Sequence, residues 1–141
     1  MKELLSRFKG ALIASALGDA IGEMAFKYKR REQLLQAIDN SEKLIYTDDT
    51  AMAIALAEYL IENDTVDIEK LGEKFAQGYE REPWRGYGLG PPKIFALVKK
   101  GLSYQEAASS IYPGGSFGNG SAMRITPAAL YFYNQPDFPK Q

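Results

Sequence analysis

The sequence predicts a helical protein folded as a single domain over residues 1–141. Apolar residues recur at spacings of three and four along most of the chain, which is the period of one face of an α-helix. Helix caps, glycines and prolines separate these runs and mark helix ends and loops. A chain of 141 residues can bury one sizeable core and leaves no room for a second.

The first predicted helix spans residues 3–21 and is apolar nearly all round, a pattern typical of a helix inside a bundle. Asp19 lies in the middle of one apolar face. Two interpretations of this acid remain open. It is either satisfied by a Lys, an Arg or a helix end, or it belongs to a functional site. The face is formed with Leu5, Phe8, Leu12 and Ala16.

A basic cluster precedes a short helix around residues 34–38, which a turn at residues 39–41 ends. Four charges so close together could hold a phosphate, but such a run is more typical of a solvated helix start. The cluster consists of Lys27, Lys29, Arg30 and Arg31.

Residues 46–50, Tyr-Thr-Asp-Asp-Thr, open the next predicted helix, which continues to residue 62 or 63. Thr47 or Asp48 can cap its first turn, where the helix dipole favours carboxylates. At 100° per residue, Asp49 falls on the apolar arc that should face the core. That arc contains Met52, Leu56 and Leu60.

A carboxylate on a core-facing arc needs a partner, because burying an unpaired charge costs several kcal/mol. A hard cation such as Mg²⁺, Mn²⁺ or Ca²⁺ would suit oxygen ligands from adjacent aspartates and a threonine. The alternative is an ordinary capped helix whose acids reach solvent.

Three further helices are predicted. One follows Asp67, with Gly78 near its end. Another spans residues 93–100 after a Pro-Pro pair, with Gly101 as its stop. The third begins with a capping box, Ser103 to Glu106, and ends near residue 111.

Two glycine-rich stretches stand between helices. Residues 85–90 hold a Tyr among alternating glycines, which suggests either backbone brought close to a ligand that stacks on Tyr87 or a plain loop. Residues 114–121 contain four glycines and lead into a helical stretch from Ala122, which Pro127 kinks or restarts near Thr126. Such a loop suits a phosphate or diphosphate, although an ordinary interhelical loop is the alternative. The tail beyond residue 133 is expected to be loop.

Composition narrows the possible chemistry. The formal charge of −1 gives no electrostatic footprint for nucleic acid. Without Cys or His, thiol nucleophiles, His bases and the usual zinc ligands are excluded, which favours carboxylates and an oxygen-ligated metal. No stretch is long enough to span a membrane and no signal peptide is recognisable, so we expect a cytoplasmic protein that does not bind membranes.

Three motifs in this order resemble the N-terminal half of the ADP-ribosylglycohydrolase family, which includes the glycohydrolase that reactivates ADP-ribosylated dinitrogenase reductase. The first is the Gly-rich run at residues 10–22 ending in Gly-Asp-Ala-Ile-Gly. The second is Tyr-Thr-Asp-Asp-Thr-Ala-Met-Ala at residues 46–53. The third is residues 114–127, with the core Gly-Ser-Phe-Gly-Asn-Gly-Ser-Ala-Met-Arg, and Arg-Gly-Tyr-Gly at residues 85–88 fits the loop between them.

This resemblance implies an all-α fold, an orthogonal helical bundle around a two-magnesium site, although Mn²⁺ would also accept the ligands. It implies hydrolysis of the bond between ADP-ribose and an acceptor, on a small molecule or an ADP-ribosylated protein. Thr47, Asp48 and Asp49 would bind the metals, and Asp48 and Asp49 would be catalytic. The substrate would contact Tyr87, Gly88, Gly115, Ser116, Phe117, Gly118, Asn119 and Gly120.

The sequence departs from the family pattern at two points. Phe26 stands where members often carry a Glu, with Glu23 one turn earlier. The second acidic motif of the family, Asp-x-Asp-Thr, is absent, so we interpret the chain as a truncated half of the fold: an isolated fragment, a shortened reading frame or a degenerate paralogue. Activity would then be doubtful, and an exposed apolar face would favour self-association. A non-catalytic ADP-ribose-binding or crystallin-like structural relative is the alternative.

Overall fold

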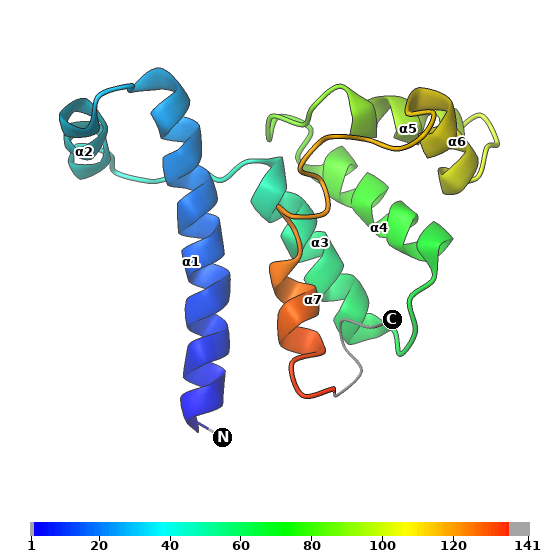
Figure 1. The fold of residues 1–141 in the computed structure, drawn as a ribbon, viewed down its shortest axis with the longest axis horizontal. Coiled ribbons are helices and arrows are strands. Elements are labelled where there is room, and N and C mark those ends of the chain that lie inside the picture. The colour runs from blue at the N-terminus through cyan, green and yellow to red at the C-terminus, as the bar shows by residue number, and fades with distance from the viewer. Residues whose placement is uncertain (1, 136–141) are drawn as a thin grey trace.

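The computed structural model describes residues 2–135 and is all-helical within that range, as the sequence predicts. Figure 1 shows α3 at the centre, with α1 and α7 on one side, α4 on the other, and α5 and α6 at the upper right above α4. No described helix is long and apolar enough to cross a membrane. The seven helices are α1 (Lys2–Lys27), α2 (Arg31–Asp39), α3 (Asp48–Glu62), α4 (Ile68–Arg81), α5 (Gly90–Val98), α6 (Tyr104–Ile111) and α7 (Thr126–Tyr131).

The central helix α3 carries most of the core. Its small residues allow close packing by α4, where Gly78 lies inside the helix and would bring an added Cβ within 3.7 Å of Ala55. That distance is an ordinary van der Waals contact, and Gly78 lies within α4 and does not end the helix as predicted. The buried residues of α3 are Thr50, Ala51, Met52, Ala53, Ala55, Tyr59 and Leu60.

Side chains cap three helix starts: the capping box of α6 was predicted, Thr47 was one of two candidates for α3, and the Asp67 cap was not predicted. The Thr47 side chain accepts a hydrogen bond from the Asp49 amide, and the Asp67 side chain accepts two from the first turn of α4. Ser103 and Glu106 form the predicted capping box of α6. These caps depend on residues within one turn, which explains why the sequence alone can locate such caps.

Three boundaries differ from the predictions. Helix α1 continues through Gly22 to Lys27, because Glu23, Met24 and Ala25 are strong helix formers. Helix α5 begins at Gly90, so the two prolines occupy its first turn, where no amide donor is needed. Residues 121–124 form turns and are not part of the helical stretch predicted from Ala122. The last helix begins at Thr126, the restart that Pro127 predicted as the alternative to a kink.

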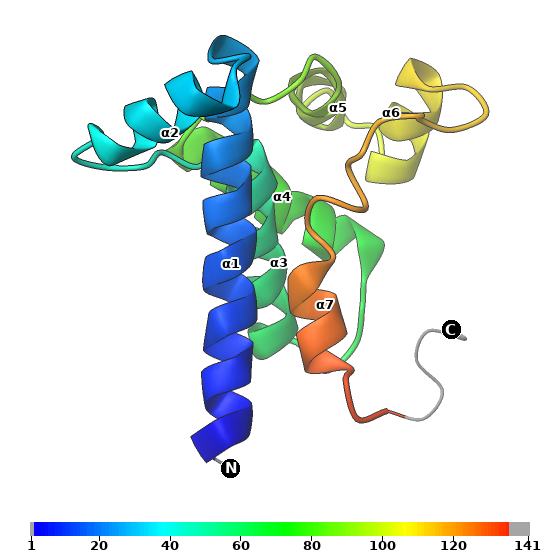
Figure 2. The same cartoon turned by 60° about the vertical axis from the view of Figure 1, so that its left-hand side comes forward.

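Helix α1 is not enclosed as its all-round apolar pattern predicts. Figure 2 shows it standing beside α3 and α7, and Ala20 is its one buried residue. Within residues 2–135 no element covers its outer faces, and large apolar side chains are exposed around the helix. They are Leu4, Leu5, Ile13 and Leu17, whereas Leu12 lines a groove against α3 and α7. Self-association through this exposed apolar surface remains a prediction.

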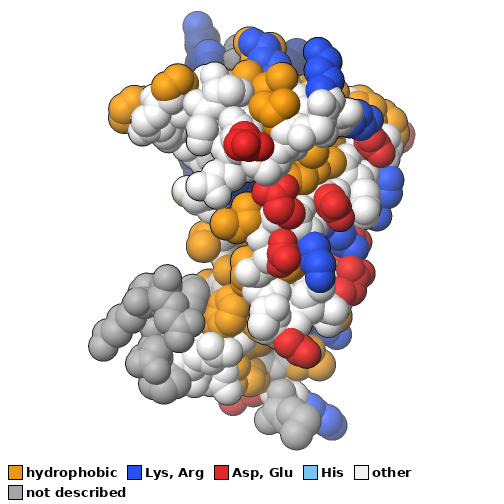
Figure 3. Space-filling view, turned by 90° about the vertical axis from the view of Figure 1, so that its right-hand side faces the viewer, with side chains coloured by type: hydrophobic (Ala, Val, Ile, Leu, Met, Phe, Trp, Pro, Cys, Tyr) orange, Lys and Arg blue, Asp and Glu red, His pale blue; other side chains and the backbone are white. Residues whose placement is uncertain are grey.

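The face formed by α4 is charged. Figure 3 shows acidic and basic side chains next to one another on the side of the molecule where α4 lies. Lys74 of α4 bonds Glu62 of α3 at 2.9 Å and lies 3.3 Å from Glu58. Exposed ion pairs of this kind contribute little to stability, so this face is a solvated surface.

Candidate functional site

Asp19 of α1 clamps the first turn of α3. One carboxylate oxygen accepts hydrogen bonds from the Thr47 amide at 2.9 Å, the Thr50 amide at 3.1 Å and the Thr50 hydroxyl at 2.6 Å. The other oxygen accepts from the Thr47 hydroxyl at 2.6 Å. Asp19 is thus satisfied at a helix end, one of the two interpretations that the sequence left open.

These hydrogen bonds determine the ionisation of Asp19. Partial burial on its own would raise the pKa, but the bonds from Thr47 and Thr50 together outweigh burial and lower it. The carboxylate therefore stays charged, and its position beside the start of α3 complements the helix dipole. Asp19 acts as a positioning residue for the turn that carries the next two acids.

Asp48 and Asp49 are in the opposite electrostatic situation. Both side chains are half-buried, and no ion pair to either is present in residues 2–135. Desolvation and the neighbouring Asp49 charge raise the pKa of Asp48 to about 6, while backbone hydrogen bonding, including that of Gly88, offsets part of the rise. Desolvation and the Asp19 charge also raise the pKa of Asp49.

The oxygen donors in this turn fit a hard divalent cation. Two carboxylates without an ion-pair partner and the Thr47 hydroxyl lie within three consecutive residues, and oxygen ligands are those that Mg²⁺ prefers. The donor set is partial, because residues 2–135 contain no group of three His, Cys, Asp or Glu side chains arranged to hold a metal. Water or groups outside the described residues would complete the coordination.

A second network fixes the turn from the other side. The Arg85 guanidinium lies 3.7 Å from the centroid of the Tyr46 ring and donates to the Tyr46 carbonyl at 3.1 Å. Arg85 also forms a salt bridge with Glu82, which accepts a hydrogen bond from the Tyr46 hydroxyl at 3.1 Å. The loop after α4 is thereby tied to the residue that precedes Thr47. The sequence showed no sign of this network, because its partners lie 36 to 39 residues apart.

The two acids lie where two clefts meet. The first, here the α1 cleft, has a volume of about 970 Å³ and is walled by α1, by residues 45–50 and by residues 84–86. The second, here the glycine cleft, has a volume of about 840 Å³ and is walled by residues 114–121, the start of α5 and the end of α6. The residues that line both clefts are Asp48, Asp49, Asn119 and Met123.

The predicted substrate residues divide among three environments. Gly88, Gly115, Ser116, Gly118, Asn119 and Gly120 line the glycine cleft, as expected for a loop that holds an anion. Phe117 projects fully into solvent from the same loop. Tyr87 lines neither cleft; its ring packs edge-on against Tyr79 at 5.0 Å. Its hydroxyl is buried without a hydrogen-bond partner within the described chain.

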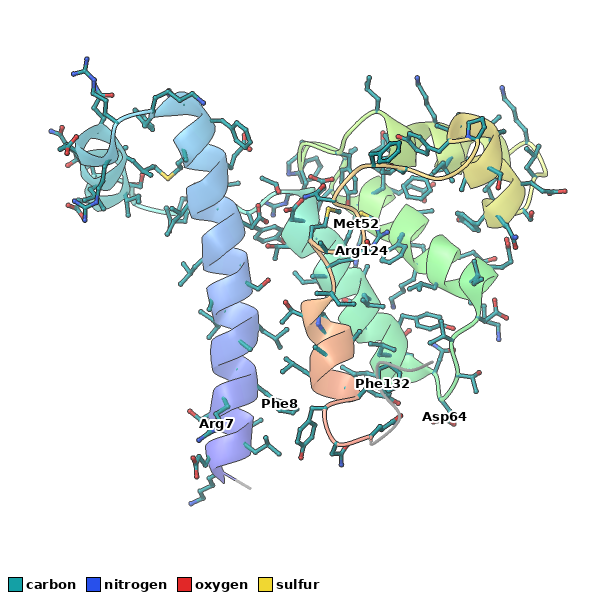
Figure 4. All side chains as sticks on the ribbon, in the orientation of Figure 1. Arg7, Phe8, Met52, Asp64, Arg124 and Phe132 are labelled. Carbon is teal, nitrogen blue, oxygen red and sulfur yellow. The ribbon has the colours of Figure 1, made fainter. Side chains whose placement is uncertain are left out.

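Arg124 is a cation at the glycine cleft that helix periodicity and motif spacing did not predict as a site residue. Figure 4 shows its side chain reaching from the segment before α7 toward Met52 of α3. It lies 3.3 Å from the Met52 sulfur and 4.6 Å from the centroid of the Phe75 ring, and it lines the glycine cleft. Desolvation lowers its pKa, and the nearby Asp48 charge opposes that effect. A positive charge therefore borders the cleft close to the acids.

The chain is similar to known proteins over nearly its whole length. A family model described as ADP-ribosylglycohydrolase matches residues 1–140. The ADP-ribosylhydrolase ARH3 of Danio rerio is 38% identical over 97% of this chain and 40% of its own length. ARH3 of Homo sapiens is 35% identical over 96% and 42%, and the ADP-ribosylarginine hydrolase Tri1 of Pseudomonas putida is 27% identical over 92% and 37%. The chain thus spans about two fifths of the length of these relatives.

Proposed function

The chain belongs to the ADP-ribosylglycohydrolase family, and we propose that it takes part in hydrolysis of the glycosidic bond between ADP-ribose and an acceptor. The observation that carries this proposal is the position of Asp48 and Asp49 at the junction of the two clefts. A hydrolase that cleaves a bond between two moieties needs its reacting groups where the two binding regions meet. This arrangement supplies that junction.

The glycine cleft is the proposed binding region for ADP-ribose. Gly114 and Gly115 have φ values of 84° and 101°, which residues with a side chain rarely adopt. The two glycines shape a loop with exposed backbone. Such a loop can direct amide donors at a diphosphate, and the Arg124 guanidinium at the cleft wall adds positive charge. Ser116 and Asn119 supply polar side chains for the riboses.

Thr47, Asp48 and Asp49 are the proposed magnesium ligands, with Mn²⁺ as an acceptable substitute. When bound, the metal would orient the ribose hydroxyls and lower the pKa of a water. An aspartate of this pair would assist proton removal from that water, and the Asp19 clamp holds the turn that carries both acids beside the cleft.

A second candidate function is non-catalytic binding of ADP-ribose. Phe26 favours it, because this residue stands on the wall of the α1 cleft where family members often carry a Glu. The two functions share the glycine cleft and differ in whether the bond is cleaved.

A binding and stability experiment tests the shared part of the proposal. Thermal unfolding of the 141-residue chain would be followed with Mg²⁺, ADP-ribose or both, beside an Asp48→Ala/Asp49→Ala variant. Ligands that bind only the folded state raise its melting temperature. We expect stabilisation in the wild type and none by Mg²⁺ in the variant. Identical melting of the wild type under every condition would refute the proposal.

A turnover assay separates the two candidates. The wild type would be incubated with an ADP-ribosylated peptide and Mg²⁺, and released ADP-ribose would be measured by chromatography. Release that stops on addition of EDTA supports hydrolysis. Binding of ADP-ribose without release supports the non-catalytic function of residues 1–141.

A further inference from the structure

The outer part of the α1 cleft carries side chains that the proposed hydrolysis does not use. Glu23 and Phe26 follow Asp19 by one and two helical turns, so they lie roughly 6 and 10 Å further along α1. Trp84 lines the same cleft from the loop after α4. Phe26 is 75% exposed and Trp84 is 71% exposed. Two bare aromatic rings beside a candidate active site are typical of a surface that binds a partner.

The charge of this cleft selects one kind of partner. Its charged lining residues are four acids and one cation, and the cation, Arg85, is bound to Glu82 and Tyr46. Asp19 is bound to Thr47 and Thr50, and Asp48 and Asp49 are the proposed metal ligands, so Glu23 is the acid left for a partner. Glu23 forms no ion pair within residues 2–135. Aromatic faces next to a free carboxylate favour guanidinium and ammonium groups.

The Phe26 ring already attracts a cation in this structure. The Lys29 ammonium lies 5.5 Å from its centroid, within the range of a cation–π contact. Lys29 comes from the turn after α1 and is exposed, so it can swing into solvent and leave the ring to another cation. The ring is thus both accessible and placed to bind positive charge.

Building on the proposed function, we infer that Glu23, Phe26 and Trp84 bind a cationic side chain next to the modified residue of an ADP-ribosylated polypeptide. The scissile bond would lie at Asp48 and Asp49, and ADP-ribose would fill the glycine cleft. Two extended residues span about 7 Å, so the side chain of an adjacent residue reaches the outer α1 cleft. The three residues determine acceptor specificity and take no part in bond cleavage.

Trp84 is the single Trp of the chain, so intrinsic fluorescence reports directly on this cleft. Two ADP-ribosylated peptides would be titrated in EDTA to prevent turnover. They differ only in an Arg or a Gln beside the ADP-ribosylated residue. We expect the Arg peptide to shift the Trp84 emission and to bind roughly three- to tenfold more tightly than the Gln peptide.

Variants test which residues are responsible. Glu23→Gln and Phe26→Ala should each reduce the preference for the Arg peptide, and both side chains are exposed enough for the fold to tolerate the change. Glu32→Gln, which removes an exposed acid of α2 outside both clefts, should leave the preference intact. Equal loss in Glu32→Gln would show a general charge effect and overturn the inference.

Calorimetric titration of free ADP-ribose distinguishes the two levels of proposal. If ADP-ribose binds but both peptides bind equally well, the specificity inference fails and the proposed function stands. If free ADP-ribose alone shifts the Trp84 emission as the Arg peptide does, the α1 cleft is not the acceptor side. If ADP-ribose and both peptides all fail to bind, the proposed function fails as well.

Discussion

Three aspartates meet at the start of α3, and they fall into two classes. Asp19 accepts four hydrogen bonds from Thr47 and Thr50, and its pKa is lowered. Asp48 and Asp49 lack ion-pair partners in residues 2–135, and their pKa values are raised. The difference arises from which groups face each carboxylate, since all three are partly buried.

The comparison separates support from chemistry within one turn. A carboxylate whose lone pairs are filled by protein donors stabilises the fold, whereas one that is desolvated without a partner costs stability and is available to a ligand. Asp19, whose carboxylate is fully hydrogen-bonded, holds the turn that carries Asp48 and Asp49. Four changes test this division, beginning with the largest expected effect.

Replacing Asp19 with Ala should lower the free energy of unfolding by about 2–4 kcal/mol, because two amides and two hydroxyls at the start of α3 lose their acceptor. Chemical denaturation in urea measures the change. Asp39→Ala, which removes an exposed acid at the end of α2, is the matched control and should change stability little. Equal stability of Asp19→Ala and wild type would mean that the clamp does not hold α3.

Asp48 should make stability fall as pH rises. Its folded pKa of about 6 lies above the ordinary value of 3.8, so the folded state binds more protons between these values. The free energy of unfolding, measured without divalent ions, should therefore decrease from pH 4 to pH 6.5. After a discount for solvent screening, the decrease is about 1–2 kcal/mol. Asp48→Asn should abolish this component, and an unchanged pH profile in that variant would contradict it.

Asp19 contributes in the reverse direction. Its lowered pKa means that the folded state releases its proton more readily than the unfolded chain. The stability that it provides is present above the ordinary pKa of 3.8 and is lost as pH falls through the lower folded value. Comparison of Asp19→Asn with wild type below pH 4 should show the two stabilities converging. A gap that widens at low pH would be inconsistent with the clamp.

Asp48→Asn at pH 7 should raise the free energy of unfolding in EDTA by about 1 kcal/mol, because an uncompensated charge is removed. The same variant should lose the stabilisation that Mg²⁺ gives to the wild type. Paired melting curves with EDTA and Mg²⁺ measure both effects. A variant that is less stable in EDTA and still responds to Mg²⁺ would reverse the assignment of Asp48.

The smallest effect is expected at Arg85. Lys in its place keeps the charge but loses the planar stacking on Tyr46 and the fork of donors. We expect a loss of about 0.5–1 kcal/mol in stability, together with faster hydrogen exchange in the loop at residues 82–88. Arg81→Lys, at a more exposed ion pair, is the control. No difference between the two variants would show that the loop is held by other contacts.

The sequence predicted what local chemistry determines. The capping box from Ser103 to Glu106 was identified correctly, and Thr47 was one of two candidates for the cap of α3, because each bonds groups within one turn. The resemblance to the family also predicted the all-α fold, which the structure confirms. The metal and substrate roles remain predictions, although the glycine cleft does bring most of the proposed substrate residues together.

Features that depend on distant partners were left open or missed. The acceptor role of Asp19 joins residues 28 and 31 positions apart, so periodicity placed the acid on an apolar face and left a helix-end partner as one of two interpretations. The Arg85 network and the approach of Arg124 to Met52, 72 residues away, have no local signal. The exposure of α1 in particular was also missed. An apolar pattern all round a helix indicates that burial of the helix would be favourable, but it does not show whether another element packs over it.

The clamp between α1 and α3 also bears on the order of folding. An isolated helix start is costly to nucleate, and here the stabilising carboxylate arrives from 28 residues earlier in the chain. During synthesis α1 leaves the ribosome before α3, so Asp19 is already present when Thr47 and Thr50 emerge. The turn that displays Asp48 and Asp49 can then close as soon as it is made, before most of the glycine cleft exists.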